Sequence, residues 1–179
     1  MKPQSIFISA LQDPLTKDEA FKKLVSEYKE RLYWHIRKLV LDNDDAHDVV
    51  QNTFIKIHLN INKFRENSSL YTWMYRIATN ESLNFINSKA AKMVLQNTEW
   101  IEAKADGLMA DSYFDGDQAA LKLQKIVARL PYKQRIVFNM KYFDNMTYEA
   151  ISEVLDTSVG ALKTSYHHAV KKIKTELND

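Results

Sequence analysis

The chain has 179 residues, 45% of them hydrophobic, which is enough to bury one core or two small ones. It contains no cysteine, which excludes a disulfide framework and a thiolate zinc site, and its three glycines and three prolines are too few for a fold of hairpins and tight loops. The net charge is only +2, and no stretch has the apolar length of a membrane span or of a convincing signal peptide. We therefore expect an all-α protein that is cytoplasmic and not inserted in a membrane.

Three helical patterns fill residues 1–88, which we assign to a first domain. Apolar residues recur at helical spacing over 18–41, over 45–61, and from Ser68 or Ser69 to about residue 87. Either serine can cap the third helix, because its hydroxyl can accept a bond from an otherwise unpaired backbone N–H.

Residues 89–117 lose this periodicity and hold two of the three glycines, with six acidic residues against three basic ones. We interpret them as a flexible acidic linker. A second, basic domain then covers 118–179. Its first helix ends at Pro131, another runs over 132–143, and the chain turns at Asp144.

The end of this second domain has the pattern of a helix-turn-helix. Thr147 can cap a short helix, Asp156 tolerates the left-handed conformation of a sharp turn, and Ser158 can cap the last helix. The face opposite the last helix's apolar stripe has no acidic residue between Asp156 and Glu176, which suits a polyanion. Taken alone, an apolar stripe with lysines opposite ordinarily indicates a core-facing helix whose other side meets solvent. The tight turn and the preceding short helix favour a DNA-binding motif.

Two polar groups of residues stand out in the first domain. The first is an acidic and amide face on the second helix, formed by Asp45, Asp48, Gln51 and Asn52. It could dock on a basic partner, although acidic residues in a first turn also complement the helix dipole.

The second group combines aromatic, cationic and amide side chains. A single-stranded nucleic acid can stack its bases on the aromatic rings, pair its phosphates with the cations and hydrogen-bond its base edges to the amides. We interpret Trp73 as a core residue. The candidates for contact with a strand are Phe64, Arg65, Tyr75, Arg76 and Asn80.

Three segments in order carry a family resemblance: DDAHDVVQNTFIKIH, then SSLYTWMYRIATNESLNFIN, then the stretch from ARLPYKQRIVF to YHHAVKKI. Together they resemble the two domains of sigma-70 family factors of the extracytoplasmic-function class, over about residues 21–177. The resemblance implies a factor that binds core RNA polymerase and promoter DNA, and whose relatives are commonly sequestered by an anti-sigma protein.

The resemblance also implies roles for residues. The helix with Asp48 would dock on polymerase, although Asn52 stands where relatives usually carry an acidic residue. The loop with Phe64 and the helix with Asn80 would melt and capture the −10 element. The helix-turn-helix would read the −35 element through Ser158, Gly160, Ala161, Lys163, Thr164, His167, His168 and Lys171, with Asp156 in place of the usual turn glycine and Ser165 and His168 where arginines are common.

Two alternatives remain. A helix-turn-helix regulator that acts without polymerase would carry a receiver or ligand domain, and residues 1–88 show helices instead. A helical metal-dependent phosphohydrolase could use the His47-Asp48 doublet with His35, but no further histidine follows with ligand spacing. We therefore expect a protein without catalytic residues, metal or cofactor.

Overall fold

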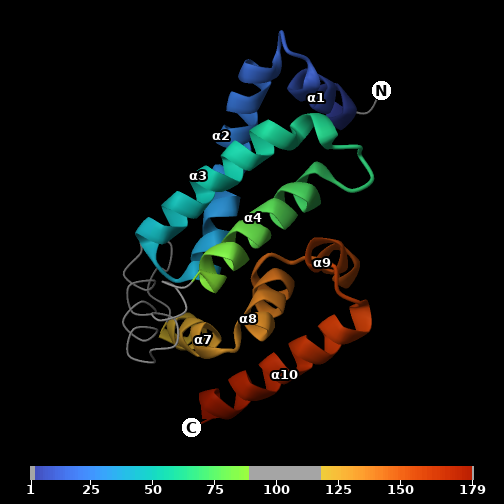
Figure 1. Cartoon of the computed structure of the whole chain (residues 1–179). Helices are drawn as coiled ribbons and strands as arrows, with labels where there is room; N and C mark the ends of the chain where they lie inside the picture. Colours follow the sequence, from blue (N-terminus) through green and yellow to red (C-terminus); the bar gives the residue numbers. More distant parts are fainter. Residues whose placement is uncertain (1–2, 89–117, 179) are drawn as a thin grey trace.

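The computed structural model describes residues 3–88 and 118–178, and every regular element in these two ranges is a helix (Figure 1). The all-α prediction is confirmed. The elements fall into an N-terminal and a C-terminal group, in the order expected from the sequence.

The N-terminal group is a bundle in which α2, α3 and α4 pack against one another in pairs, while α1 packs on α2. Ser69 caps α4 by accepting a bond from the Thr72 backbone N–H at 3.0 Å. Helix α1 was not expected from the sequence. The elements are α1 (Pro3–Gln12), α2 (Lys17–Val40), α3 (Asn43–Asn60), the short 3₁₀ turn η1 (Ile61–Lys63) and α4 (Leu70–Asn87).

The C-terminal group places α8 and α9 between α4 and α10 (Figure 1). The helix expected over 132–143 is interrupted, because its second half winds as a wider π turn. The elements are α7 (Gln118–Arg129), α8 (Tyr132–Phe138), the π turn η2 (Asn139–Phe143), α9 (Tyr148–Leu155) and α10 (Val159–Asn178).

Two apolar clusters hold the molecule together. The larger one combines buried residues of α1–α4 with buried residues of α8, α9 and the start of α10. The smaller one joins α7, α8 and α10 around Phe138 and Ile173. The larger core is therefore continuous from the N-terminal helices into the C-terminal ones.

Candidate functional site

The turn between α9 and α10 is built by hydroxyl caps and one left-handed residue. Thr147 caps α9 and Ser158 caps α10, each accepting a backbone N–H bond, at 3.1 and 3.3 Å respectively. Asp156 has a φ of 49°, and its backbone N–H bonds to the Ser152 carbonyl. Aspartate thus takes the conformation that glycine most often adopts after a helix. The predicted turn and both caps are confirmed.

Helix α10 separates a buried face from an exposed one. Leu162, Ala169 and Ile173 are buried where α10 packs on α7, α8 and α9. The eight positions predicted to read the −35 element are all exposed: Ser158, Gly160, Ala161, Lys163, Thr164, His167, His168 and Lys171. Because residues 157–175 include no acidic residue, the lysines on this face are not neutralised by a carboxylate within that stretch of sequence.

Two lysines flank the ring of Tyr148 in α9. Lys163 Nζ lies 5.8 Å from the ring centroid, and Lys141 Nζ lies 5.1 Å from it. Lys141 also donates to the Met146 carbonyl at 3.0 Å, whereas Lys163 is exposed. Lys163 is therefore positioned beside the first helix of the motif while its ammonium stays open to solvent.

An open pocket of about 490 Å³ lies between α3, η1 and α4. Trp73 contributes a partly exposed indole, and Arg76 and Asn80 are exposed. The pocket thus offers a flat apolar ring, a cation and an amide, the groups that bind an unstacked base and its phosphate. It is lined by Lys56, Asn60, Lys63, Trp73, Arg76, Ile77, Asn80, Glu81 and Asn84.

Two residues predicted to contact a DNA strand are buried, which corrects that prediction. Phe64 is 6% exposed, with its ring centroid 5.3 Å from that of Trp73. Tyr75 is 2% exposed and lies against Tyr71, and burial raises the pKa of its hydroxyl. Neither ring has a free face for a base. Arg65 is exposed in the loop but does not line the pocket, and Trp73, expected in the core, does.

The predicted docking residues lie on the outer surface of α3, where Asp48, Gln51 and Asn52 are exposed and Asp45 is half-buried. The same side of the helix continues into two large apolar residues that the sequence reasoning missed. Ile55 is 50% exposed and Leu59 is 69% exposed. They follow Gln51 by four and eight residues, so they share its face. Their position off the buried apolar stripe was a signal present in the sequence.

A groove of about 510 Å³ runs beside this face, between α2 and α3. Exposed apolar residues next to a groove mark a surface that is suited to a partner. The groove is lined by Phe21, Val25, Lys29, His47, Val50, Gln51, Phe54, Ile55, His58 and Leu59.

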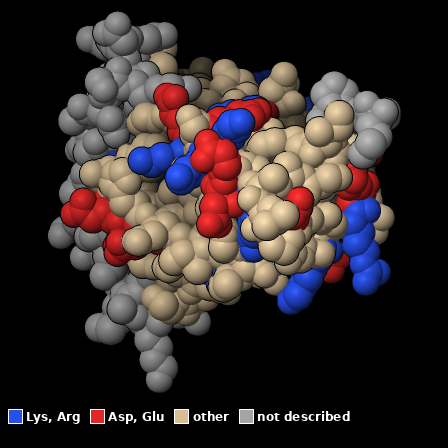
Figure 2. Space-filling model, turned by 90° about the horizontal axis from the view of Figure 1, so that it is seen from above, with Lys and Arg blue, Asp and Glu red and all other residues tan. Residues whose placement is uncertain are grey.

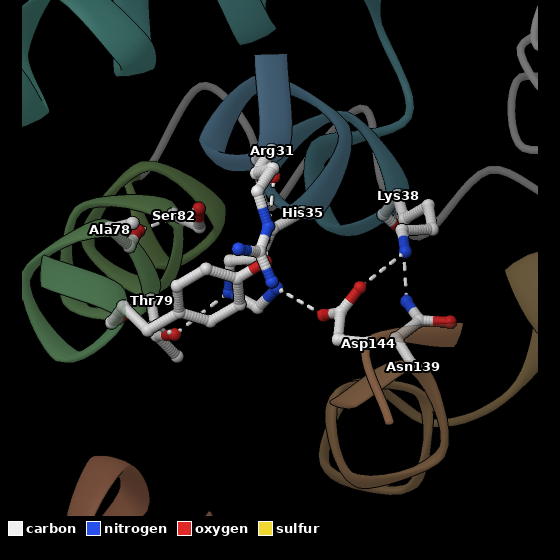
Figure 3. A network of polar contacts seen from close by, with 9 residues as sticks. Arg31, His35, Lys38, Ala78, Thr79, Ser82, Asn139 and Asp144 are labelled. Carbon is white, nitrogen blue, oxygen red and sulfur yellow. Dashed lines mark hydrogen bonds and ion pairs between the residues drawn. The ribbon is translucent and has the colours of Figure 1, made fainter. Parts of the chain in front are cut away.

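A polar network that was not predicted joins the two groups of helices (Figure 3). Asp144, which follows η2, faces His35 Nδ1 at 3.0 Å and accepts from Lys38 Nζ at 2.7 Å. Both partners come from α2. Burial alone would raise the pKa of the Asp144 carboxyl, but the hydrogen bonds and charges of His35 and Lys38 outweigh burial and hold that pKa below its ordinary value.

The histidines that suggested a metal-dependent enzyme are engaged in separate places. His35 is buried between Asp144 and Thr79, and the ring of His47 lies 5.0 Å from that of Tyr33. Within residues 3–88 and 118–178, no group of three or more histidines or acidic residues is placed to hold a metal ion. In the same two ranges, none of the helices combines the length and the apolar character needed to cross a membrane.

The face seen from above in Figure 2 shows acidic and basic side chains side by side, separated by wide uncharged areas. Neither sign dominates this face. It differs in this respect from the exposed side of α10 between Gly160 and Thr175, which carries lysines and histidines and no acidic residue. A polyanion therefore finds its more favourable surface at α10.

Comparison with known proteins matches both groups of helices to family models. The model of sigma-70 region 2 matches residues 24–92, and the model of sigma-70 region 4 matches residues 120–173. The chain is 29% identical over 169 residues to the ECF RNA polymerase sigma factor SigW of Bacillus subtilis, covering 90% of each chain. It is 28% identical over 167 residues to the ECF RNA polymerase sigma-E factor of Escherichia coli K12, covering 89% of this chain and 87% of that one.

Two solved structures share the fold. One is CnrH in complex with the cytosolic domain of CnrY, with a TM-score of 0.68 and 20% identity over 98% of this chain and 97% of that one. The other is the sigma factor RpoE in complex with the anti-sigma factor NepR from Bartonella quintana, with a TM-score of 0.69 and 20% identity over 88% and 96%. The two family models together match more than half of the chain. The chain therefore belongs to the sigma-70 family, as a sigma factor of the extracytoplasmic-function class that directs transcription initiation.

Proposed function

We propose that this sigma factor docks on core RNA polymerase through the outer face of α3 and captures the unpaired −10 strand in the pocket between α3 and α4. The exposed face of α10 then binds the −35 duplex. The observation that carries the proposal is the pocket itself, because Trp73, Arg76 and Asn80 line one open surface within the region 2 segment.

The energetics of strand capture favour this pocket. Extruding a base from a duplex costs on the order of a few kcal/mol. Stacking of a base on an aromatic ring contributes roughly 1–3 kcal/mol of binding free energy. The partly exposed indole of Trp73 can provide that ring. The Asn80 amide can hydrogen-bond a base edge, and the Arg76 guanidinium can pair with the adjacent phosphate.

The exposed face of α10 suits a duplex. Its N-terminal turn carries Gly160 and Ala161, and a Cβ added at Gly160 would meet no atom within 4 Å. Packing inside the protein therefore does not require this glycine, and its small size leaves room for close approach to DNA. Lys163 and Lys171 can bind phosphates, while Thr164 can reach base edges.

The strand-capture proposal is tested with Asn80→Ala in reconstituted holoenzyme. Formation of the open complex, followed by the reactivity of unpaired thymines, should slow by more than closed-complex binding weakens. Asn87→Ala is the matched control, because Asn87 is an exposed amide of the same helix outside the pocket. Equal losses in the two steps for Asn80→Ala would count against base capture.

The docking proposal is tested with the double variant Asp48→Arg and Gln51→Ala. Co-purification with core polymerase should be lost while helicity stays unchanged. Glu19→Arg makes the same charge change at an exposed site on α2 outside the groove and should leave binding intact. Undiminished binding of the double variant would remove α3 as the docking face and place the contact with polymerase on another surface of the chain.

We further propose that this factor works in the cytoplasm, without catalysis of its own, and that an anti-sigma protein holds it inactive. One of the structures that share its fold is a complex with an anti-sigma factor. Co-purification of the tagged chain from its native cells, followed by mass spectrometry, tests for such a partner.

A further inference from the structure

Helix α1 is held to the rest of the molecule by its apolar side. A helix of ten residues is too short to be stable by itself in water, so it depends on packing. Ile8 is 2% exposed and Leu11 is fully buried, and both belong to the larger apolar cluster. The helix packs on α2 and on η1, the turn that follows α3 (Figure 1). It precedes the region 2 match at residues 24–92, so that match assigns it no role.

The segment from η1 to the start of α4, residues 61–69, has little backbone support of its own. We refer to it as the pocket loop. Residues 65–68 form no backbone–backbone hydrogen bond within the part of the chain that the structure describes. Glu66 has a φ of 55°, in the left-handed region that residues other than glycine rarely adopt. The conformation of the pocket loop therefore depends on the side chains that hold it from outside.

Gln12, the last residue of α1, holds the pocket loop by two hydrogen bonds. Its Nε2 donates to the Ile61 carbonyl and to the Phe64 carbonyl, each at 3.0 Å. Both amide hydrogens are thus used, and the amide cannot turn over, because its oxygen would then face two carbonyl oxygens. The Phe64 backbone N–H donates to the same Ile61 carbonyl at 3.1 Å. A further, exposed contact joins the Ser5 hydroxyl to the Glu66 carboxylate at 3.2 Å.

The pocket loop forms part of the wall of the pocket between α3 and α4. Asn60 and Lys63 line that pocket, and Lys63 Nζ donates to Asn60 Oδ1 at 3.1 Å. Phe64 is buried behind the pocket, where its ring packs against the indole of Trp73. Gln12 does not line the pocket itself. A displaced loop would therefore move a cation of the pocket and the ring that supports its indole, although Gln12 touches neither.

We propose that Gln12 is a positioning residue for strand capture, which ties the pocket loop to α1 and so holds Lys63 and Trp73 in place before the strand binds. A loop that is already ordered does not have to be ordered on binding, which lowers the entropic cost of association. The role of Gln12 rests on the proposed function of the pocket, whereas the tie between α1 and the loop is a property of the free protein.

The tie is tested on the free full chain by hydrogen exchange of the Phe64 backbone N–H, followed by NMR. Gln12→Met keeps the length of the side chain and removes both donated bonds. Gln12→Glu keeps its shape but turns an acceptor toward the two carbonyls. Exchange should speed up about tenfold in the methionine variant and at least as much in the glutamate variant, because a loop released from α1 opens more often.

Ser9→Ala is the matched control for the exchange experiment. Ser9 is exposed on the same helix, and its hydroxyl donates within α1 to the Ser5 carbonyl at 2.9 Å. This variant should exchange at the wild-type rate. Circular dichroism verifies that each variant keeps its helicity. Wild-type exchange of the Phe64 N–H in either Gln12→Met or Gln12→Glu would overturn the tie.

The positioning role is tested in reconstituted holoenzyme with probes from a promoter that the wild-type chain recognises. Gln12→Met introduces no charge, so it is the variant used with DNA. It should weaken binding of a single-stranded −10 probe about tenfold and leave the affinities for a duplex −35 probe and for core polymerase unchanged. Ser9→Ala should match the wild type in all three measurements.

The outcomes distinguish the positioning role from strand capture itself. A Gln12→Met chain that exchanges faster but binds the −10 probe like the wild type would overturn the positioning role and leave strand capture intact. Equal weakening on the −10 and −35 probes would make Gln12 a residue of general stability, which also overturns the role. If the wild-type holoenzyme does not bind the −10 probe, strand capture fails and the positioning role fails with it, while the exchange result still decides whether the tie exists.

Discussion

Helices α4 and α10 were both assigned DNA-contacting residues from sequence, and they differ in how those residues lie. All the positions predicted on α10 and its cap are exposed, whereas the set predicted on α4 and the loop before it is divided between surface and core. Arg76 and Asn80 are on the surface, while Phe64 and Tyr75 are buried.

The cause of this difference is the number of neighbours around each helix. Helix α10 packs on one side only, against α7, α8 and α9, so its apolar stripe and its polar face are separate in sequence and in space. Helix α4 packs against α2 and α3 and also against α9, which follows it by about 60 residues. An amphipathic pattern therefore identifies the free face of a helix at the edge of a fold, and it fails for a helix that a distant segment also covers.

The largest expected effect is on the free energy of unfolding. It separates the buried aromatic residue of α4 from the exposed positions of α10. Tyr75→Ala removes a ring from the core and should lower the free energy of unfolding by about 3–5 kcal/mol. His167→Ala on α10 should change it by less than about 0.5 kcal/mol. Equilibrium denaturation by urea, followed by circular dichroism, measures both.

Tyr75→Phe completes this comparison. The Tyr75 hydroxyl lies 3.5 Å from the Arg31 carbonyl, a weak hydrogen bond, so its loss should cost less than about 1 kcal/mol. A Tyr75→Ala variant as stable as Tyr75→Phe would mean that the ring is not packed in the core, and Tyr75 would return to the candidates for strand contact.

The next effect concerns the salt dependence of DNA binding by the two helices. In holoenzyme, Lys171→Ala should flatten the slope of log affinity against log salt by about 0.9 on a duplex −35 probe, if one phosphate contact is lost. Arg76→Ala should flatten it by about 0.7 on a single-stranded −10 probe. Each variant should leave the slope on the other probe unchanged. The same response of both variants on both probes would contradict the division of labour between α4 and α10.

Much of the fold was predictable because its signals are local. Ser69, Thr147 and Ser158 cap the helices that they were expected to cap, and Asp156 turns the chain as predicted. Helical periodicity placed α2, α3 and α4 to within two residues at each end. Helix α1 was not predicted, because an apolar run as short as Ile6–Leu11 does not distinguish a helix from a strand by its periodicity.

The site was less predictable because its decisive contacts are not local. Asp144 and His35 are separated by 109 residues, and in the sequence Asp144 looked like an ordinary turn residue. Tyr75 is buried because its side of α4 meets α2, where its ring centroid lies 4.5 Å from that of His35. Trp73 is partly exposed because its side of α4 faces the pocket beside α3. Sequence spacing gives the angle between two side chains on one helix, but it does not tell which distant helix covers either of them.

The smallest effect concerns the one residue of the helix-turn-helix that departs from the family's usual glycine. At a φ of 49°, glycine has no steric penalty, aspartate has a small one, and alanine has a larger one because it lacks a polar side chain to stabilise the left-handed conformation. Asp156→Gly should therefore raise the free energy of unfolding by up to about 0.5 kcal/mol, and Asp156→Ala should lower it by about 1 kcal/mol. Thermal and urea unfolding of the three proteins give the order. An alanine variant as stable as the glycine variant would show that the turn relaxes away from the left-handed conformation, and the rigid placement of α10 on which its exposed face depends would then be lost.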